Sequence, residues 1–504
     1  MLHWLDYALF AAYLLATAGV GSMFFKRKSD LSGYLQGSHQ MHSSVVAISI
    51  IASLFSGISY LSSPSETFHY NLVYTWSLAS YFVATPITAY VFLPFYFKLN
   101  LYSAYEYLER RFDSRVRTIS SASFIFRAAL WMSLAIYAPA LVLAEMIGLP
   151  LWISVVITGL GTTAYTTLGG MKAVIWTEVL QFFVLIAGVV VIIFVAADRV
   201  PDGMQGAWKL AAAEGRTKLF DMRLDPRLRM TFWGAFIGGI PLVLSSMAAD
   251  QMSVQRYLTT SSLREGQRAM WLQMLLTVPM CIVFYLTGTV LFGFYAANPG
   301  RLGALEQPDR IFPYFVIHEL PTPMPGLLIA AVFAATMWTI SGGLNALATV
   351  TLVDFFARFR GKPYDDAESV KLARTLTIAY GIFTTGLAMF VGKLGSLIEI
   401  IGLMGGLMGG PMLGIFLLAV FSRRTNGTGT LIGAIIGTAV VLAVALYSDI
   451  SFMWHCLIST CVTVAVGWVC SLFFPSPSAE QQANFVYSGA GRRAMEKADA
   501  RATA

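Results

Sequence analysis

The residues best suited to bind an ion or a solute form a short polar segment inside an apolar stretch of chain. Residues 49–66 read SIIASLFSGISYLSSPSE and hold seven serines, one glycine and one proline. In hydrocarbon every backbone N–H and C=O needs a partner, so an interrupted helix persists only where it lines a cavity or is buried in protein. We expect a break within residues 53–63, which would free carbonyls for a cation and expose a helix N-terminus to an anion. Close helix packing through small residues explains the serines equally well.

A second interrupted segment supports the binding interpretation. Residues 232–246 read FWGAFIGGIPLVLSS, and glycine and proline again interrupt an apolar run five spans after the first. Two broken spans in corresponding positions of two halves are typical of a secondary transporter built from inverted repeats. The halves would be spans two to six and seven to eleven. Their pairing rests on this pattern, because they share no clear sequence identity.

The composition requires an all-helical membrane protein. Of the 504 residues, 57% are hydrophobic and only 12% are charged, which is too little charge to cover a soluble protein of this size. Apolar runs long enough to cross roughly 30 Å of hydrocarbon recur from end to end. They predict thirteen spans, at residues 3–25, 43–67, 71–97, 119–146, 150–168, 176–197, 231–250, 268–296, 325–351, 372–391, 396–421, 427–447 and 452–474.

Charge predicts the orientation of these spans. The first run lacks a basic leader and is followed by Lys-Arg-Lys at residues 26–28, so we expect no cleaved signal peptide. Lys and Arg gather in the loops that alternate on that side, which predicts an outer N-terminus and a cytoplasmic C-terminus. We attribute the net charge of +7 to these loops and expect no nucleic-acid partner. The basic segment 101–117 is expected to lie along the membrane surface.

The spans divide the chain into five parts. Residues 1–42 hold the first helix and a basic loop, 43–230 the first repeat with a long outer loop, and 231–421 the second repeat. Residues 422–474 hold two peripheral helices, and 475–504 a polar tail that we expect to be disordered. The four cysteines lie in apolar runs without metal-ligand spacing and are interpreted as packing residues. The expected partners are the lipid bilayer and a small solute, with the chain working as a monomer.

Several motifs together resemble a known family. They are ASLFSGISYLSSPSETF (52–68), SAYEYLERRFDSRVR (103–117), YTTLGGMKAVIWTEVLQ (165–181), DQMSVQRYL (250–258) and GGLNALATVTLVDF (342–355). They resemble the sodium:solute symporter family, and most of all its branch of monocarboxylate, multivitamin and iodide carriers. The resemblance implies a LeuT-type fold of five-plus-five inverted repeats and Na⁺-driven uptake by alternating access.

The resemblance also implies a Na⁺ site between the first broken helix and the span at 325–351. Its expected ligands are the carbonyls of Ala52, Phe55 and Ala335 and two hydroxyls, at positions 338 and 339. Thr339 fits this role. Trp338 does not, because an indole offers one N–H donor and no acceptor. We interpret the site as retained but perturbed, with Thr336 or Ser341 as alternative sources of the missing oxygen.

A second cation position is implied at Glu178, within the sixth span, together with the hydroxyl of Ser341. A carboxylate within a span is costly and is by default a functional candidate. It resembles the acidic residue of the family that binds or releases a second sodium. The alternatives are an acid near the interface and a partner of Lys172. Because a glutamate can be protonated, coupling to H⁺ stays open.

The solute is expected to bind beside the first break, at Ser56, Gly57 and Ser59, with Tyr74 as one wall. Arg127, inside the fourth span, would suit a carboxylate; a structural ion pair is the alternative. Asp250, Gln251, Gln255 and Arg256 are interpreted as structural or as part of an inner gate.

The leading hypothesis is therefore a cation-coupled importer of a small organic anion. The alternatives are the same fold carrying a neutral or zwitterionic solute, and a solute sensor with weakened coupling. An enzyme is disfavoured, because the sequence has no cluster of His, Cys and carboxylate residues, no nucleophile elbow and no metal-binding motif.

Overall fold

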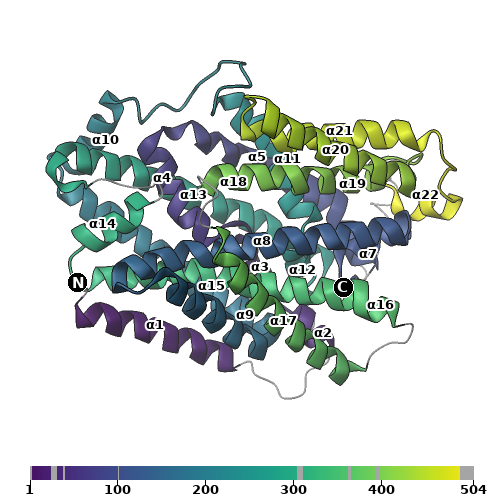
Figure 1. Ribbon diagram of the computed structural model, residues 1–504, viewed down its shortest axis with the longest axis horizontal. Helices are drawn as coiled ribbons and strands as arrows, with labels where there is room; N and C mark the ends of the chain where they lie inside the picture. Colours follow the sequence, from purple (N-terminus) through teal and green to yellow (C-terminus); the bar gives the residue numbers. More distant parts are fainter. Residues whose placement is uncertain are drawn as a thin grey trace.

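The computed structural model describes residues 3–23, 31–37, 40–99, 101–303, 310–360, 365–391 and 397–487, and these residues form helices and connecting segments without a strand. The long helices run along the horizontal axis of Figure 1. Short helices α10 (Gly203–Ala213) and α14 (Ile311–Glu319) lie at one end, and α7 (Ala104–Arg111) and α22 (Ala479–Phe485) at the other. The basic loop predicted at residues 24–30 and most of the tail predicted to be disordered lie outside the described residues.

The first half of the chain follows the predicted spans closely. Local sequence sets the helix ends: α8 (Ser114–Ile147) begins where the Asp113 side chain accepts from two backbone N–H groups and ends at Gly148, whose positive φ of 72° favours glycine. The other elements are α1 (Trp4–Met23), α2 (Leu31–Gln36), α3 (Ser43–Leu54), α4 (Gly57–His69), η2 (Leu72–Leu78), α5 (Ala79–Ile87), η3 (Thr88–Phe92), α6 (Leu93–Leu99) and α9 (Leu151–Asp198).

The second half contains more irregular helix, with several π-helical turns inserted into its spans. Its elements are η4 (Gly234–Gly238), α11 (Gly239–Leu244), η5 (Ser245–Ala249), α12 (Gln251–Tyr257), α13 (Leu263–Ala297), η6 (Pro299–Arg301), α15 (Met324–Val350), η8 (Thr351–Phe356), α16 (Ala357–Phe359), α17 (Asp366–Ala388), α18 (Leu397–Met404), η10 (Gly405–Gly409), α19 (Gly410–Phe421), α20 (Gly427–Tyr447), η11 (Phe452–Trp454) and α21 (His455–Ser471).

Each predicted span corresponds to a helical segment, although not all are long straight helices. Among the described residues, eight helices are long and apolar enough to cross a membrane, and a pair bent by 55° makes a ninth. The other four segments are α1, the broken pair α3 and α4, the first part of α9, and α17, which begins with polar residues.

The two predicted spans at 150–168 and 176–197 are present as the apolar stretches Leu151–Ala164 and Met171–Asp198, but no break in the helix separates them. They are one continuous helical element, α9, of 48 residues. If straight it would be about 72 Å long, more than twice the hydrocarbon thickness. Its contacts show that it doubles back: Thr167 and Lys172 both lie against α2 and its end at Gly37, whereas Arg199, just after its last turn, bonds to Glu319 of α14 at the opposite end of the molecule.

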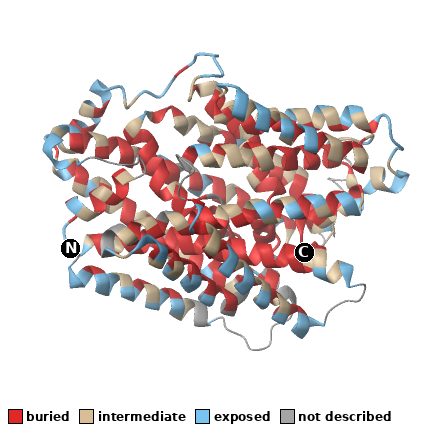
Figure 2. Ribbon diagram, in the orientation of Figure 1, coloured by how far each residue is buried: buried red, intermediate tan, exposed pale blue. Residues whose placement is uncertain are grey.

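Burial divides the helices into an inner group and an outer shell (Figure 2). α15 lies at the centre, and nearly all of its residues are buried. Large apolar side chains on outer helices are exposed, including Phe183 and Phe194 on α9, Phe383 on α17 and Ile435 on α20. Such surfaces suit contact with lipid, which is as apolar as the side chains themselves.

One face of the basic segment 101–117 packs into the protein, and its expected place along the membrane surface stays a prediction. Arg111 of α7 is fully buried and donates to the carbonyls of Ala419, Ser422 and Thr425. The hydrophobic face of α7 is buried too, so Arg111 is held by protein partners, whereas the neighbouring Arg110 is exposed.

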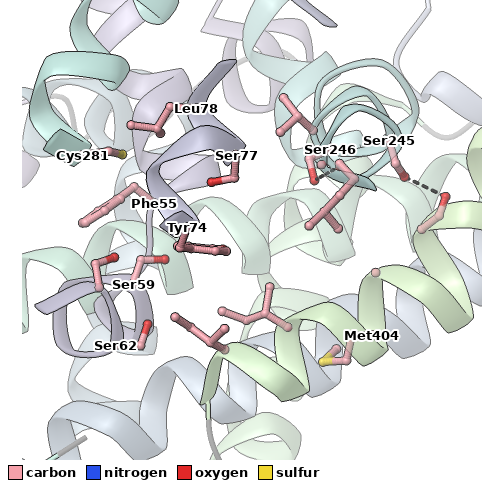
Figure 3. A pocket seen from close by; sticks show the side chains of 18 of the residues that line it. Phe55, Ser59, Ser62, Tyr74, Ser77, Leu78, Ser245, Ser246, Cys281 and Met404 are labelled. Atoms are coloured by element: carbon pink, nitrogen blue, oxygen red, sulfur yellow. Dashed lines mark hydrogen bonds between the residues drawn. The ribbon is translucent and has the colours of Figure 1, made fainter. Parts of the chain in front are cut away.

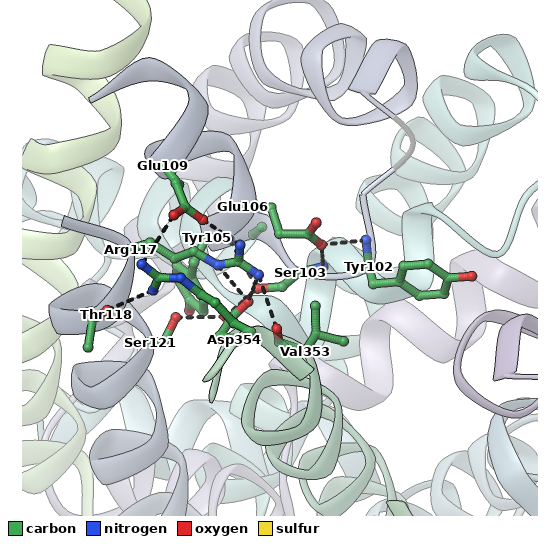
Figure 4. A network of polar contacts seen from close by, with 12 residues as sticks. Tyr102, Ser103, Tyr105, Glu106, Glu109, Arg117, Thr118, Ser121, Val353 and Asp354 are labelled. Atoms are coloured by element: carbon green, nitrogen blue, oxygen red, sulfur yellow. Dashed lines mark hydrogen bonds and ion pairs between the residues drawn. The ribbon is translucent and has the colours of Figure 1, made fainter. Parts of the chain in front are cut away.

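A buried ion pair ties this segment to the end of the central helix (Figure 4). Arg117 donates to Asp354 at 2.5 Å and to Glu109 at 2.6 Å. Asp354 is completely buried and also accepts from the hydroxyls of Ser103 and Ser121. The guanidinium of Arg117 and two serine hydroxyls thus converge on the buried Asp354, whereas Glu109 is partly exposed.

We expect Asp354→Ala to destabilise the protein by about 3 kcal/mol, because it leaves the nearly buried Arg117 with only its partly exposed partner Glu109. The measurement is thermal unfolding of the purified protein in detergent. Glu368→Ala is the matched control, since it removes an exposed ion pair with Arg360 that is worth about 0–1 kcal/mol. Equal melting temperatures for the two variants would contradict the assigned role of Asp354.

Candidate functional site

The first predicted break is present and lies within residues 53–63. α3 ends at Leu54 and α4 begins at Gly57, and the two residues between them, Phe55 and Ser56, have extended backbone angles. The Ser56 side chain caps α4 by accepting from the Ser59 N–H, and the Ser56 carbonyl accepts from Tyr60. The Phe55 carbonyl makes no bond of this local kind and is one of the acceptors that the break releases, together with carbonyls of the last turn of α3.

Helix α15 supplies the partner for that carbonyl. The indole N–H of Trp338 donates to the Phe55 oxygen at 2.7 Å, and the Trp338 side chain is fully buried. One turn away, Gly57 lies directly against Thr336: a Cβ at Gly57 would be 2.4 Å from the Thr336 hydroxyl oxygen. The break is therefore packed tightly against α15 on both sides.

The remaining residues of the expected Na⁺ site lie on the two elements that meet here. The Thr339 hydroxyl donates to the Ala335 carbonyl at 3.0 Å, and Ser341 donates to the Trp338 carbonyl. Thr336, the alternative oxygen source, donates to Val332. Ala52 belongs to the last turn of α3, and its side chain lies outside the described part of the structure.

The second break lies later in the chain than predicted. The stretch at residues 232–246 stays helical, because two π-helical segments, η4 and η5, flank α11 and loosen the turns around Pro241. The helix breaks at Asp250 instead, which is extended and whose side chain caps α12 by accepting from Met252. An Asp directly before a helical pattern is an N-cap signal, and here it marks the break that glycine and proline placement did not predict.

Between the two breaks lies a cavity of about 200 Å³ (Figure 3). Ser59 and Ser62 of α4 face it from one side, Tyr74 and Ser77 of η2 from another, and Ser245 and Ser246 of η5 from a third. With Ser63 on α4, six serine side chains line the space. Of the residues expected to contact the solute, Ser59, Tyr74 and Arg127 line this cavity, whereas Ser56 and Gly57 do not.

Arg127 is the cationic side chain at this cavity among the described residues, and it is paired with Asp250 of the second break. One terminal N–H donates to the Asp250 carboxylate, and the guanidinium also lies over the Phe124 ring. No other hydrogen bond involves Arg127 in the described part of the chain. Because the side chain is about one-fifth exposed, its other N–H donors can reach a solute.

Glu178 lies in a separate polar cluster and has an internal cation as its partner. Its carboxylate accepts from Arg256 at 2.6 Å and from Ser49, and all three residues are fully buried. Arg256 also donates to Ser49 and to the Met252 carbonyl. The cluster joins α3, α9 and α12, so the partner of Glu178 is Arg256 and not Lys172. Arg256 belongs to the group that the sequence assigned to a structural or gating role.

Comparison with known proteins identifies the family. The model of the sodium:solute symporter family matches residues 34–437. The human sodium-coupled monocarboxylate transporter 1 is 32% identical over 88% of this chain and 74% of its own length. The rabbit sodium-dependent multivitamin transporter is 31% identical over 89% and 71%, and the human sodium/iodide cotransporter 32% over 88% and 69%. The chain belongs to the sodium:solute symporter family.

Solved structures agree with this assignment. A Na⁺-coupled sialic acid symporter in a substrate-bound outward-open state is 29% identical and superimposes with a TM-score of 0.87, covering 94% of this chain and 99% of that one. A nucleobase-cation-symport-1 family transporter superimposes with a TM-score of 0.58 at 16% identity, which supports the fold alone. As a sodium:solute symporter, this membrane protein has the expected LeuT-type fold, carries a small solute and uses Na⁺ as its coupling ion. The family is one of transporters, not enzymes.

In this symporter the buried Arg256–Glu178 pair depends on a glycine of α15. A Cβ at Gly342 would lie 2.1 Å from a terminal nitrogen of Arg256. That nitrogen ends a long side chain, but three buried partners hold the guanidinium and leave it no free space. The approach of α12 to α15 therefore requires glycine at this position.

We expect Gly342→Ala to lower the stability by about 2 kcal/mol or more, because the displaced Arg256 leaves Glu178 buried without its cation. Gly386→Ala in α17 is the control, since a Cβ there meets nothing within 4 Å and alanine favours a helix by about 1 kcal/mol. The melting temperature should fall for the first variant and stay or rise for the second. A Gly342→Ala protein as stable as the parent would show that the pair does not need this approach.

Proposed function

We propose that this sodium:solute symporter imports a small organic anion, with a monocarboxylate as the leading class, and that Arg127 binds the anionic group. The observation that carries the proposal is the state of Arg127: one N–H is bonded to Asp250, and the side chain, about one-fifth exposed, lines the cavity. A guanidinium has five N–H donors, and a carboxylate takes up two of them when it binds through parallel hydrogen bonds. Arg127 therefore keeps donors for a solute while it is bonded to Asp250.

The chemistry of the cavity supports this proposal. Its serine hydroxyls supply donors and acceptors for oxygen atoms of the solute, while Tyr74, Tyr81 and Trp131 supply apolar surface. A cavity of about 200 Å³ suits a small molecule. The relatives named for monocarboxylates and for iodide are carriers of anions, which agrees with a cationic side chain at the cavity.

A zwitterionic solute is the second candidate, because Asp250 lies at the same cavity. A solute with both charges would pair its carboxylate with Arg127 and its ammonium group with Asp250, exchanging the internal ion pair for two external ones. A monoanion would instead share Arg127 with Asp250. The two candidates therefore differ in their dependence on Asp250.

The proposed cycle follows from the two broken spans. The repeats at 43–230 and 231–421 would rock against each other around the cavity, in a monomer with its N-terminus outside and its C-terminus in the cytoplasm. Na⁺ promotes closure only through a difference in its affinity for the outward and inward states. Cysteine variants at Asn298, in the loop after α13, and at Asn426, before α20, would be labelled from outside and inside respectively if this orientation is right.

The test of the solute class is uptake by liposomes that contain the purified protein. Labelled pyruvate, lactate, propionate, pantothenate, proline and a hexose are each offered with an inward Na⁺ gradient, an inward H⁺ gradient and no gradient. We expect Na⁺-dependent uptake of at least one carboxylate and none of the hexose. Uptake of the hexose alone would contradict the anion proposal, and solute binding without uptake would favour the sensor.

Replacing Arg127 separates recognition from structure. We expect the double variant Arg127→Gln/Asp250→Asn, which removes both charges, to fold with near-parental stability and to raise the KM for the carboxylate by about 10- to 100-fold, the value of a charged hydrogen bond or two. Arg127→Lys should retain part of the affinity, because it keeps the charge and loses the fork. An unchanged KM in the double variant would make Arg127 a purely structural partner of Asp250.

A further inference from the structure

We propose that Trp338 closes the cation site at the break between α3 and α4: its indole N–H holds the Phe55 carbonyl where a coupling ion would bind, so Na⁺ acts from another site. The inference uses the Na⁺ coupling of the family and is independent of which solute is carried. It departs from the expectation of a retained but perturbed site. The two contacts of the break with α15 carry it.

The first step concerns the acceptors at the break. Unwound carbonyls at the end of a half-helix are the groups that bind a coupling cation in broken-helix transporters. Here the Ile51 carbonyl accepts from the Phe55 N–H and the Ser56 carbonyl accepts from the Tyr60 N–H. The Phe55 carbonyl is released by the break, and Trp338 takes it at 2.7 Å. A protein donor thus satisfies the acceptor that an ion would need.

The side chains around the Phe55 carbonyl leave little space for an ion. Trp338 is the largest of the fully buried side chains, and it stands where the family pattern calls for a small hydroxyl residue. On the neighbouring turn, Gly57 approaches Thr336 so closely that an added methyl group would overlap the hydroxyl. A cation needs several oxygen ligands around it. The buried indole ring occupies volume beside the Phe55 carbonyl, and α4 approaches α15 closely two residues further along the chain.

The charge of the indole N–H also opposes a cation at the Phe55 carbonyl. A hard cation of the size of Na⁺ binds an oxygen at about 2.4 Å, and an N–H donor at 2.7 Å already directs a partial positive charge at the same oxygen. The two would repel each other across one carbonyl in the protein interior, where such repulsion is screened less than in bulk water. The indole has no lone pair to offer in return. Trp338 therefore replaces the ion as the positive group at the break.

The nearby acid does not restore the site. Glu178 is fully engaged by Arg256 and Ser49, and the Ser341 hydroxyl is donated to the Trp338 carbonyl. At both positions that the family pattern assigns to cations, protein donors engage expected ligands: Trp338 the Phe55 carbonyl, and Arg256 the Glu178 carboxylate. The Thr339 hydroxyl is left with the Ala335 carbonyl, its neighbour on the same helix.

The experiment counts Na⁺ ions bound by the purified full chain, with radioactive ²²Na⁺ and no solute present. We expect Trp338→Ser to bind one more Na⁺ per chain than the parent, and the double variant Trp338→Ser/Thr339→Val to lose that gain. Trp338→Phe, which keeps the ring and removes the N–H, should gain none. A Trp338→Ser protein that binds the same number of ions as the parent overturns the proposal.

A second variant keeps the test valid if Trp338→Ser does not fold. Thr339→Val in the parent removes only the hydroxyl and keeps the shape of the side chain. With the site closed, the Na⁺ concentration for half-maximal binding should change less than about twofold. An increase of about tenfold or more, the effect of removing one ligand from an ion, would mean that Na⁺ binds at Thr339 and would overturn the proposal.

Discussion

A carbonyl released inside hydrocarbon must find a donor, and the centre of this protein is organised by how its two helix breaks meet that requirement. At the first break the Trp338 indole of α15 donates to the Phe55 carbonyl. At the second, the hydroxyls of Tyr96 and Tyr105 donate to the carbonyls of Ala248 and Ala249, and the Asp250 side chain accepts from the Met252 N–H. The two solutions leave different surroundings. Phe55 and Asp250 both border the serine-lined cavity, but the first break is also held against α15, whereas Asp250 pairs with Arg127.

The buried charges also find their partners within the protein. Arg117 pairs with Asp354, Arg127 with Asp250, and Arg256 with Glu178. In each pair one residue lies in 43–230 and the other in 231–421, and the Trp338–Phe55 bond also joins these two parts. Ion pairs of this kind add little net stability but are costly to break on one side only. They fix how these two parts of the chain meet in this conformation, and any relative motion of the two parts has to exchange these partners for others.

Sequence predicts most of this architecture and less of its fine structure. Thirteen helical segments, the break at Phe55 and Ser56 and the position of Arg127 at a cavity follow from hydropathy, from serine and glycine placement and from the cost of an intramembrane charge. The second break lies at Asp250, which caps α12, and not at the glycines and Pro241. π-Helical turns keep that stretch helical, and such turns have no simple sequence signal. Long-range pairs such as Arg256 with Glu178 depend on tertiary packing that local patterns do not encode.

The hydrogen bond between Trp338 and Phe55 has an energetic consequence for the cell that contains this protein. Across a membrane potential of 100 mV and a tenfold gradient, each Na⁺ contributes about 3.7 kcal/mol to accumulation, or a concentration ratio of roughly 500. A carrier that moves one Na⁺ fewer per monoanion concentrates its cargo less steeply by that factor. If a single Na⁺ accompanies a single negative charge, the cycle moves no net charge, and uptake continues at an unchanged limit when the membrane depolarises. One indole ring would then determine both the maximum concentration ratio of the solute and whether that ratio depends on the membrane potential.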